Sequence, residues 1–67
     1  MMPAEQLADT LTQPELMRLA LRRQHRLRDF IKLGAPMPVL RRQRQLLKTA
    51  LLAMALRDML SWEMVRP

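Results

Sequence analysis

The segment from Ala50 to Leu56, ALLAMAL, contains no polar side chain, and it lies in a chain of only 67 residues. A helix at the surface of a globular protein presents one apolar stripe, whereas a helix that is apolar all round is covered on more than one side. The run is far shorter than the ~20 apolar residues that a membrane-spanning helix needs, so we expect no membrane partner. This segment must therefore be covered by the rest of a short chain or by another protein.

The length of the chain predicts one small domain, and domains of this size are commonly stabilised by disulfides, a metal or a partner chain. There is no cysteine and only one histidine, His25. Disulfides, thiolate metal sites and a zinc site are therefore excluded, and we expect no metal and no cofactor. A partner chain is the stabilising element that remains.

The composition predicts an all-α fold. Leu, Met, Ala, Arg and Gln dominate the chain and favour helices, whereas Val and Ile, which favour strands, are scarce. The first residues include Glu5 and Asp9 but no basic segment ahead of an apolar core, so no signal peptide is expected. We therefore predict a helical protein of the cytoplasm.

The first long helix is predicted over residues 13–33, after an arm formed by residues 1–12. Thr12 can cap the helix, and Glu15 stands at the reciprocal position of a capping box. Pro14 is tolerated in the first turn, where its missing N–H costs no hydrogen bond. The start of this helix is therefore well defined by side-chain chemistry.

The second long helix is predicted over residues 38–64, after a turn at 34–37. Gly34 can adopt the left-handed conformation that ends a helix. Two long helices joined by so short a turn lie antiparallel, so the expected fold is a two-helix hairpin in a single domain, residues 1–67. The segment from Pro3 to Leu11 can form a short additional helix.

Placing residues at 100° intervals gives each long helix one apolar stripe, and the two stripes are expected to form the seam of the hairpin. Arg23 interrupts the stripe of the first helix and should weaken the middle of the seam. The expected seam consists of Leu16, Leu19, Ala20, Leu27, Phe30 and Ile31 on the first helix and Val39, Leu40, Leu46, Leu47, Ala50, Leu51 and Met54 on the second.

A further apolar stripe on the second helix remains outside this seam, at the end away from the turn. Two readings are open: Leu7 and Leu11 of the arm fold back over the stripe, or another chain covers it. We predict another chain, because the arm offers few apolar residues and soluble monomers seldom expose such a patch. Trp62 is either a packing residue or an anchor for the partner. The candidate partner-binding residues are Met17, Leu21, Leu52, Leu56, Met59, Leu60 and Trp62.

Catalytic chemistry has little to use in this sequence. His25 stands among cationic residues and is expected to face solvent. The single glycine excludes a glycine-rich phosphate loop, and the acidic residues are scattered. We therefore predict that the protein is not an enzyme and has no catalytic residues.

Positive charge is concentrated in the middle of the chain. The net charge is +6, and residues 18–48 carry ten Arg or Lys against one Asp. Nucleic acid, an acidic protein partner and solubility each explain this excess. Nucleic acid is the less favoured partner, because aromatic residues for stacking and a short helix-turn-helix are missing. The predicted basic patch consists of Arg22, Arg23, Arg26, Arg41, Arg42 and Arg44.

The layout also carries a resemblance to a known family over residues 16–60. A charged first helix ends in LRDFIKLG, from Leu27 to Gly34; a short Pro-containing turn follows, then RRQRQ, and then an Ala/Leu-rich run from Leu47 to Leu56. This pattern resembles the small YscE-type co-chaperones of bacterial type III secretion systems, which include PscE and EscE-like members.

The resemblance implies a helical hairpin in the bacterial cytoplasm that pairs with a tetratricopeptide-repeat (TPR) chaperone. The pair would hold the needle subunit of a virulence-associated secretion apparatus and prevent its early polymerisation. The alternative function is a small basic nucleic-acid-binding hairpin, acting as a dimeric regulator. Self-association through the same apolar stripe is expected when the partner is absent.

Overall fold

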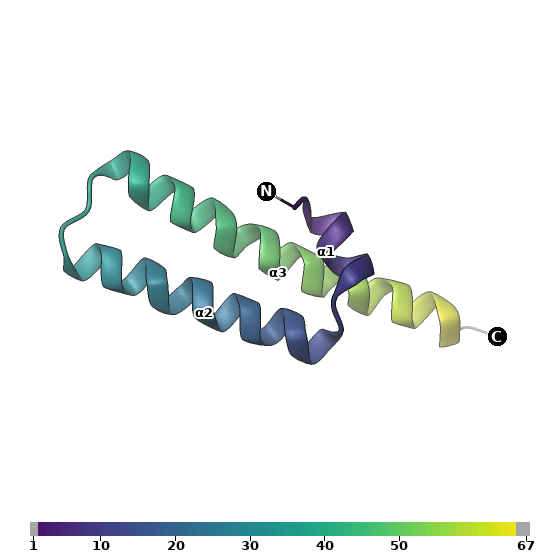
Figure 1. Cartoon of the computed structure of the whole chain (residues 1–67). Helices are drawn as coiled ribbons and strands as arrows, with labels where there is room; N and C mark the ends of the chain where they lie inside the picture. The colour runs from purple at the N-terminus through teal and green to yellow at the C-terminus, as the bar shows by residue number, and fades with distance from the viewer. Residues whose placement is uncertain (1, 66–67) are drawn as a thin grey trace.

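The computed structural model describes the backbone of residues 2–65 and the side chains of residues 2–60. It contains α1 (Ala4–Thr10), α2 (Gln13–Lys32) and α3 (Met37–Val65), and no strand within the described residues (Figure 1). The prediction of an all-α fold is therefore confirmed, and the arm contains a helix of its own.

The start of α2 is held by the predicted capping box. The backbone N–H of Glu15 donates to the Thr12 hydroxyl at 3.4 Å, and the Glu15 carboxylate accepts from the Thr12 backbone N–H at 3.0 Å. Both bonds satisfy N–H groups that have no partner within the helix. Pro14 lies in the first turn, as expected.

The end of α2 is closed by a Schellman motif centred on Gly34, whose φ of 71° is the left-handed conformation that glycine favours. The N–H of Ala35 donates to the carbonyl of Phe30 at 3.0 Å, and the N–H of Gly34 donates to that of Ile31 at 3.1 Å. The helix α3 then begins at Met37, one residue before the predicted start, because the Pro36 carbonyl accepts the first helical hydrogen bonds.

The helices α1 and α2 both pack on α3. Figure 1 shows α2 and α3 side by side in opposite directions, with α1 folded back onto α3 at the end away from the turn. The molecule measures 51 × 17 × 15 Å, with a radius of gyration of 13.8 Å. A compact chain of this length has a radius of gyration of about 11 Å. The fold is therefore elongated, and little of it is interior.

The core lies where α1 and α2 meet α3. Leu16 and Ala53 are fully buried there, and Leu7 is almost so. Alanine at position 53 leaves room for the two other helices to approach the backbone of α3. The buried cluster consists of Ala4, Leu7, Ala8, Leu16 and Ala53, with Leu11, Leu19, Met54 and Leu56 packed against it.

Two residues of the predicted seam lie outside it, which corrects the sequence prediction. Leu51 is 51% exposed and Ile31 is 58% exposed. The helix α3 turns the side that carries Ala50 and Ala53 toward its neighbours, so Leu51, 100° away from Ala50, lies at the edge of the seam and is half exposed. Ala53 was missed because a small residue contributes little to an apolar stripe.

Polar side chains cross the seam at two points. Arg23 donates from Nη1 to the carbonyl of Leu46 at 2.6 Å, and Gln13 donates from Nε2 to that of Met54 at 3.2 Å. Arg23 therefore lies in the seam, as its position in the apolar stripe indicated. The buried Oε1 atoms of Gln13 and Gln43 accept no hydrogen bond within the described residues, so the seam is less apolar than the predicted stripe.

Candidate interaction surface

The helix α1 covers part of the apolar surface that the sequence left open. It buries Leu7 and Ala8 against α3 and partly covers Leu56. Arg57 of α3 donates from Nη1 to the carbonyl of Ala8 at 2.6 Å. This carbonyl is in the last turn of α1, where backbone acceptors lack helical partners and a cation is favourable. The reading in which the arm folds back is thus correct for one flank of α3.

A distal patch remains beyond α1, formed by the exposed Leu52, Met59 and Leu60 and by the partly buried Leu56. Leu52 is 55% exposed and Met59 is 63% exposed, although each is a large apolar side chain. Three of the four residues line a depression of about 330 Å³ whose other wall is α1, with Glu5 and Asp9 at its edge. The distal patch is therefore apolar in the middle and acidic on the side of α1.

Three residues of the distal patch, Leu56, Met59 and Leu60, lie on a part of α3 that extends past α2. Gln13, the first residue of α2, is hydrogen bonded to the carbonyl of Met54. Residues 55–65 of α3 thus continue for about 16 Å, at 1.5 Å per residue, with only α1 beside them (Figure 1). Met59 and Leu60 on this projecting end are exposed and therefore accessible to another molecule.

Met17 and Leu21, which the sequence placed with this stripe, lie on another face of the hairpin. They are 53% and 48% exposed, and they line a depression of about 300 Å³ together with Leu47, Leu51 and Met54. The successive residues Leu51 and Leu52 lie 100° apart on α3 and so serve different surfaces. The predicted partner surface is therefore divided in two.

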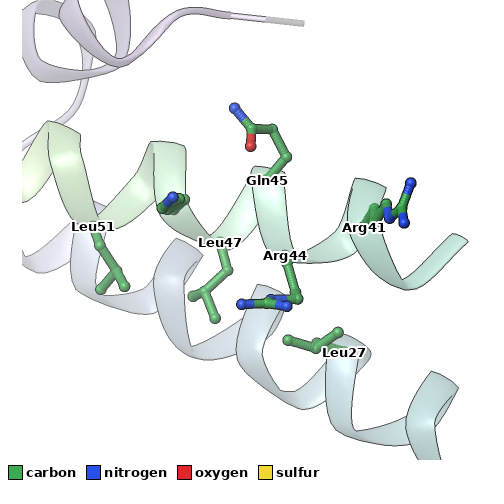
Figure 2. Close-up of a pocket in the computed structure, with 7 residues that line it drawn as sticks. Leu27, Arg41, Arg44, Gln45, Leu47 and Leu51 are labelled. Carbon is green, nitrogen blue, oxygen red and sulfur yellow. The ribbon is translucent and has the colours of Figure 1, made fainter. Parts of the chain in front are cut away.

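We call the second surface the hairpin groove; its floor is formed by Met17, Leu21, Leu47, Leu51 and Met54. It continues toward the turn as a depression of about 440 Å³, which Leu47 and Leu51 also line. Figure 2 shows these two leucines pointing from α3 toward α2, with Arg44 beside Leu27 at the turn end. The rim at this end is formed by Arg41, Arg44 and Lys48.

The predicted basic patch does not form a single face. Arg23 is turned into the seam, where burial, and then the neighbouring Arg22, lower its pKa. Arg22 and Arg26 line a separate depression beside Leu46, whereas Arg41 and Arg44 border the hairpin groove. Apart from Arg23, all predicted members are exposed. Positive charge therefore surrounds the turn half of the hairpin.

Two further predictions concern aromatic and catalytic groups. His25 is exposed, as predicted. The side chain of Trp62, which was predicted to pack or to anchor the partner, lies outside the described residues. Among the described residues, no three His, Asp or Glu side chains are grouped closely enough to hold a metal ion. Over the same residues, none of the helices combines the length and apolar character needed to cross a membrane.

In comparisons with known proteins, no family model, no curated protein and no solved structure matches the chain.

Proposed function

We propose that this protein is a non-catalytic co-chaperone that uses the distal patch to bind and stabilise a helical partner protein. The observation that carries the proposal is the exposure of Leu52, Met59 and Leu60, which are 55%, 63% and 48% exposed although α1 covers the neighbouring part of α3. Burying one such side chain contributes ~1.5–3 kcal/mol, so a partner that covers the patch gains a substantial part of its affinity there.

The overall surface of the chain supports the same proposal. The solvent-accessible area is 5586 Å² for a protein of 7.9 kDa. A compact monomer of this mass exposes about 4,400 Å². The chain therefore exposes more surface than a compact monomer of the same mass. A partner that covers the projecting end of α3 would reduce this excess.

The family resemblance supplies the partner in this proposal. By that resemblance, it is a TPR chaperone, and the pair sequesters the needle subunit of a bacterial type III secretion system in the cytoplasm before export. Stacked helix pairs present extended concave surfaces, which suit a projecting helix such as residues 55–65. The acidic edge formed by Glu5 and Asp9 adds a requirement for basic or neutral groups on the partner.

The test is co-purification of the protein with the TPR chaperone of a type III secretion system from the same genome. The double variant Leu52→Glu and Met59→Glu should lose the complex while its circular dichroism remains helical, because both side chains are exposed in the isolated chain. Leu33→Glu, at an 81% exposed position beside the turn, is the matched control and should retain the complex. Retention of the complex by the double variant would show that the distal patch is not the binding surface.

A nucleic-acid-binding hairpin is the second candidate, and the exposed arginines around the turn favour it. Affinity for DNA or RNA would then fall steeply with salt, because phosphate contacts release counterions. Arg41 and Arg42 are both exposed, so their double replacement by Glu should weaken such binding without unfolding α3. A gel-shift assay at physiological salt that detects no complex would remove this candidate.

A further inference from the structure

The hairpin groove is a surface that the proposed co-chaperone function does not use. It shares no residue with the distal depression, and it opens on a different face of α3. Its floor contains three exposed apolar side chains, Met17, Leu21 and Leu51, each about half open to solvent. The groove therefore presents a second apolar surface on the same small molecule.

The groove has the length and shape of a helix-binding site. Its two depressions share Leu47 and Leu51, so they form one channel between α2 and α3. Along α3 the channel runs from Arg41 to Met54, which is about 20 Å at 1.5 Å per residue. An occupying α-helix of about four turns would match this length.

The charge of the groove is of one sign. Arg41, Arg44 and Lys48 line its turn end, and no carboxylate is among the residues that line either depression. Arg44 lies beside Leu27 at the edge of the apolar floor (Figure 2). A ligand that buries its own apolar stripe on this floor thus places its flank directly against cations.

From these features we infer that the hairpin groove binds an amphipathic helix of another protein, with an apolar stripe flanked by Asp or Glu side chains. The stripe packs on Met17, Leu21 and Leu51, and the carboxylates face Arg44 and Lys48. Helix-in-groove recognition of this kind uses apolar anchors at i, i+3 or i+4, and i+7. Complementary charge selects the helix and its orientation.

A second copy of this chain is a poorer occupant of the groove. In a two-fold dimer formed groove to groove, the same rim lies on both sides of the interface. The interface would then contain Arg44 and Lys48 of both copies, and neither groove lining supplies a carboxylate to offset their charge. A helix with acidic flanks removes this repulsion.

The test uses a synthetic fluorescent peptide of about 18 residues, long enough for the channel. It carries Leu at heptad a and d positions and Glu on both flanks; a second peptide has Lys in place of every Glu. Fluorescence anisotropy measures binding to the full-length protein. We expect the Glu peptide to bind at least about tenfold more tightly than the Lys peptide at low salt.

Leu51 and Leu52 provide matched variants, because they are neighbours of similar exposure on different faces. Leu51→Glu should weaken binding of the Glu peptide by at least about tenfold, whereas Leu52→Glu should change it by less than about twofold. The double variant Arg44→Glu and Lys48→Glu should reverse the preference and favour the Lys peptide. The co-chaperone proposal is tested at Leu52 in the distal patch, whereas this inference is tested at Leu51 in the hairpin groove. Failure of one therefore leaves the other intact.

Three outcomes would overturn the inference. Equal binding of the two peptides would show that the rim does not select charge. Loss of binding in Leu52→Glu but not in Leu51→Glu would move the site to the distal patch. A dimer in light scattering that only Leu51→Glu dissociates, together with no peptide binding, would identify a second copy as the occupant.

Discussion

Thr12 and Glu15 show how a short sequence motif determines a helix boundary. The Thr12 hydroxyl accepts from one backbone N–H, and the Glu15 carboxylate accepts from another and from that hydroxyl. Each bond is local, so it does not depend on the packing of the rest of the chain. This is why the predicted first residue of α2 agrees with the structure.

Acid should destabilise the protein through Glu15. The backbone N–H of Thr12 and then its hydroxyl hold the pKa of Glu15 below its usual range. The contribution is complete above the unfolded-state pKa of about 4.3, and it is lost as the pH falls through the lower folded-state value. The melting temperature of the wild type should therefore fall more than that of Glu15→Gln between about pH 6 and pH 3. Parallel curves would contradict this assignment.

Arg23 combines an apolar stem with a charge that is partly removed from water. The guanidinium of Arg23 donates a hydrogen bond to the carbonyl of Leu46 in α3, and burial lowers the pKa of Arg23. Long basic side chains of this kind contribute through packing of their methylene groups as well as through charge. Packing of the Arg23 methylene groups can therefore stabilise the seam even if the charge does not.

Substitution at Arg23 separates these contributions. Arg23→Ala should lower the free energy of unfolding by ~1 kcal/mol, because it removes the stem from the seam. Arg23→Met keeps an apolar stem and should recover most of this loss. Urea denaturation measures both variants. If Arg23→Met is as unstable as Arg23→Ala, the hydrogen bond to Leu46 is the main contribution.

Among the elements, α1 depends most on its neighbours. It has seven residues, Ala4–Thr10, and isolated helices shorter than ~12–15 residues are marginal in water. Leu7 and Ala8 are buried against the other helices, and Arg57 of α3 satisfies the Ala8 carbonyl. The helix is thus stabilised by tertiary contacts, mainly on the side of α3 that carries Ala53.

Ala53 should be the least tolerant position on that side. It is fully buried in the core cluster, so Ala53→Leu inserts a side chain where no space exists and should cost ~1–3 kcal/mol. Ala55 is exposed on the same helix, and Ala55→Leu should change stability by less than ~0.5 kcal/mol. Chemical denaturation compares the two. Equal stabilities would mean that α1 does not pack closely on α3.

The whole molecule is long and thin, which leaves it with two separate exposed apolar surfaces. The distal patch has an acidic edge near α1, whereas the hairpin groove has a basic rim near the turn. A thicker bundle of the same length of chain would bury one of them. The small number of helices is therefore what leaves both surfaces available.

Small-angle X-ray scattering should detect this shape. At low protein concentration the monomer should have a radius of gyration near the 13.8 Å of the structure, against about 11 Å for a compact chain. Self-association through exposed apolar side chains should raise the value as concentration increases, and Leu52→Glu with Leu51→Glu should suppress the rise. A concentration-independent value near that of a compact chain would contradict the elongated fold.

The helical class and the helix boundaries near Thr12 and Gly34 follow from local sequence, because helix capping and the left-handed conformation of glycine act within a few residues. The sequence also identified large apolar side chains that lie outside the hairpin seam. The face that each of these side chains occupies depends instead on how the helices pack together. Ala53 is buried and Leu51 is half exposed because α1 and α2 both pack on α3, and this packing includes contacts between segments more than 40 residues apart, such as Arg57 with Ala8. Helical periodicity describes each helix alone, so it does not contain that information.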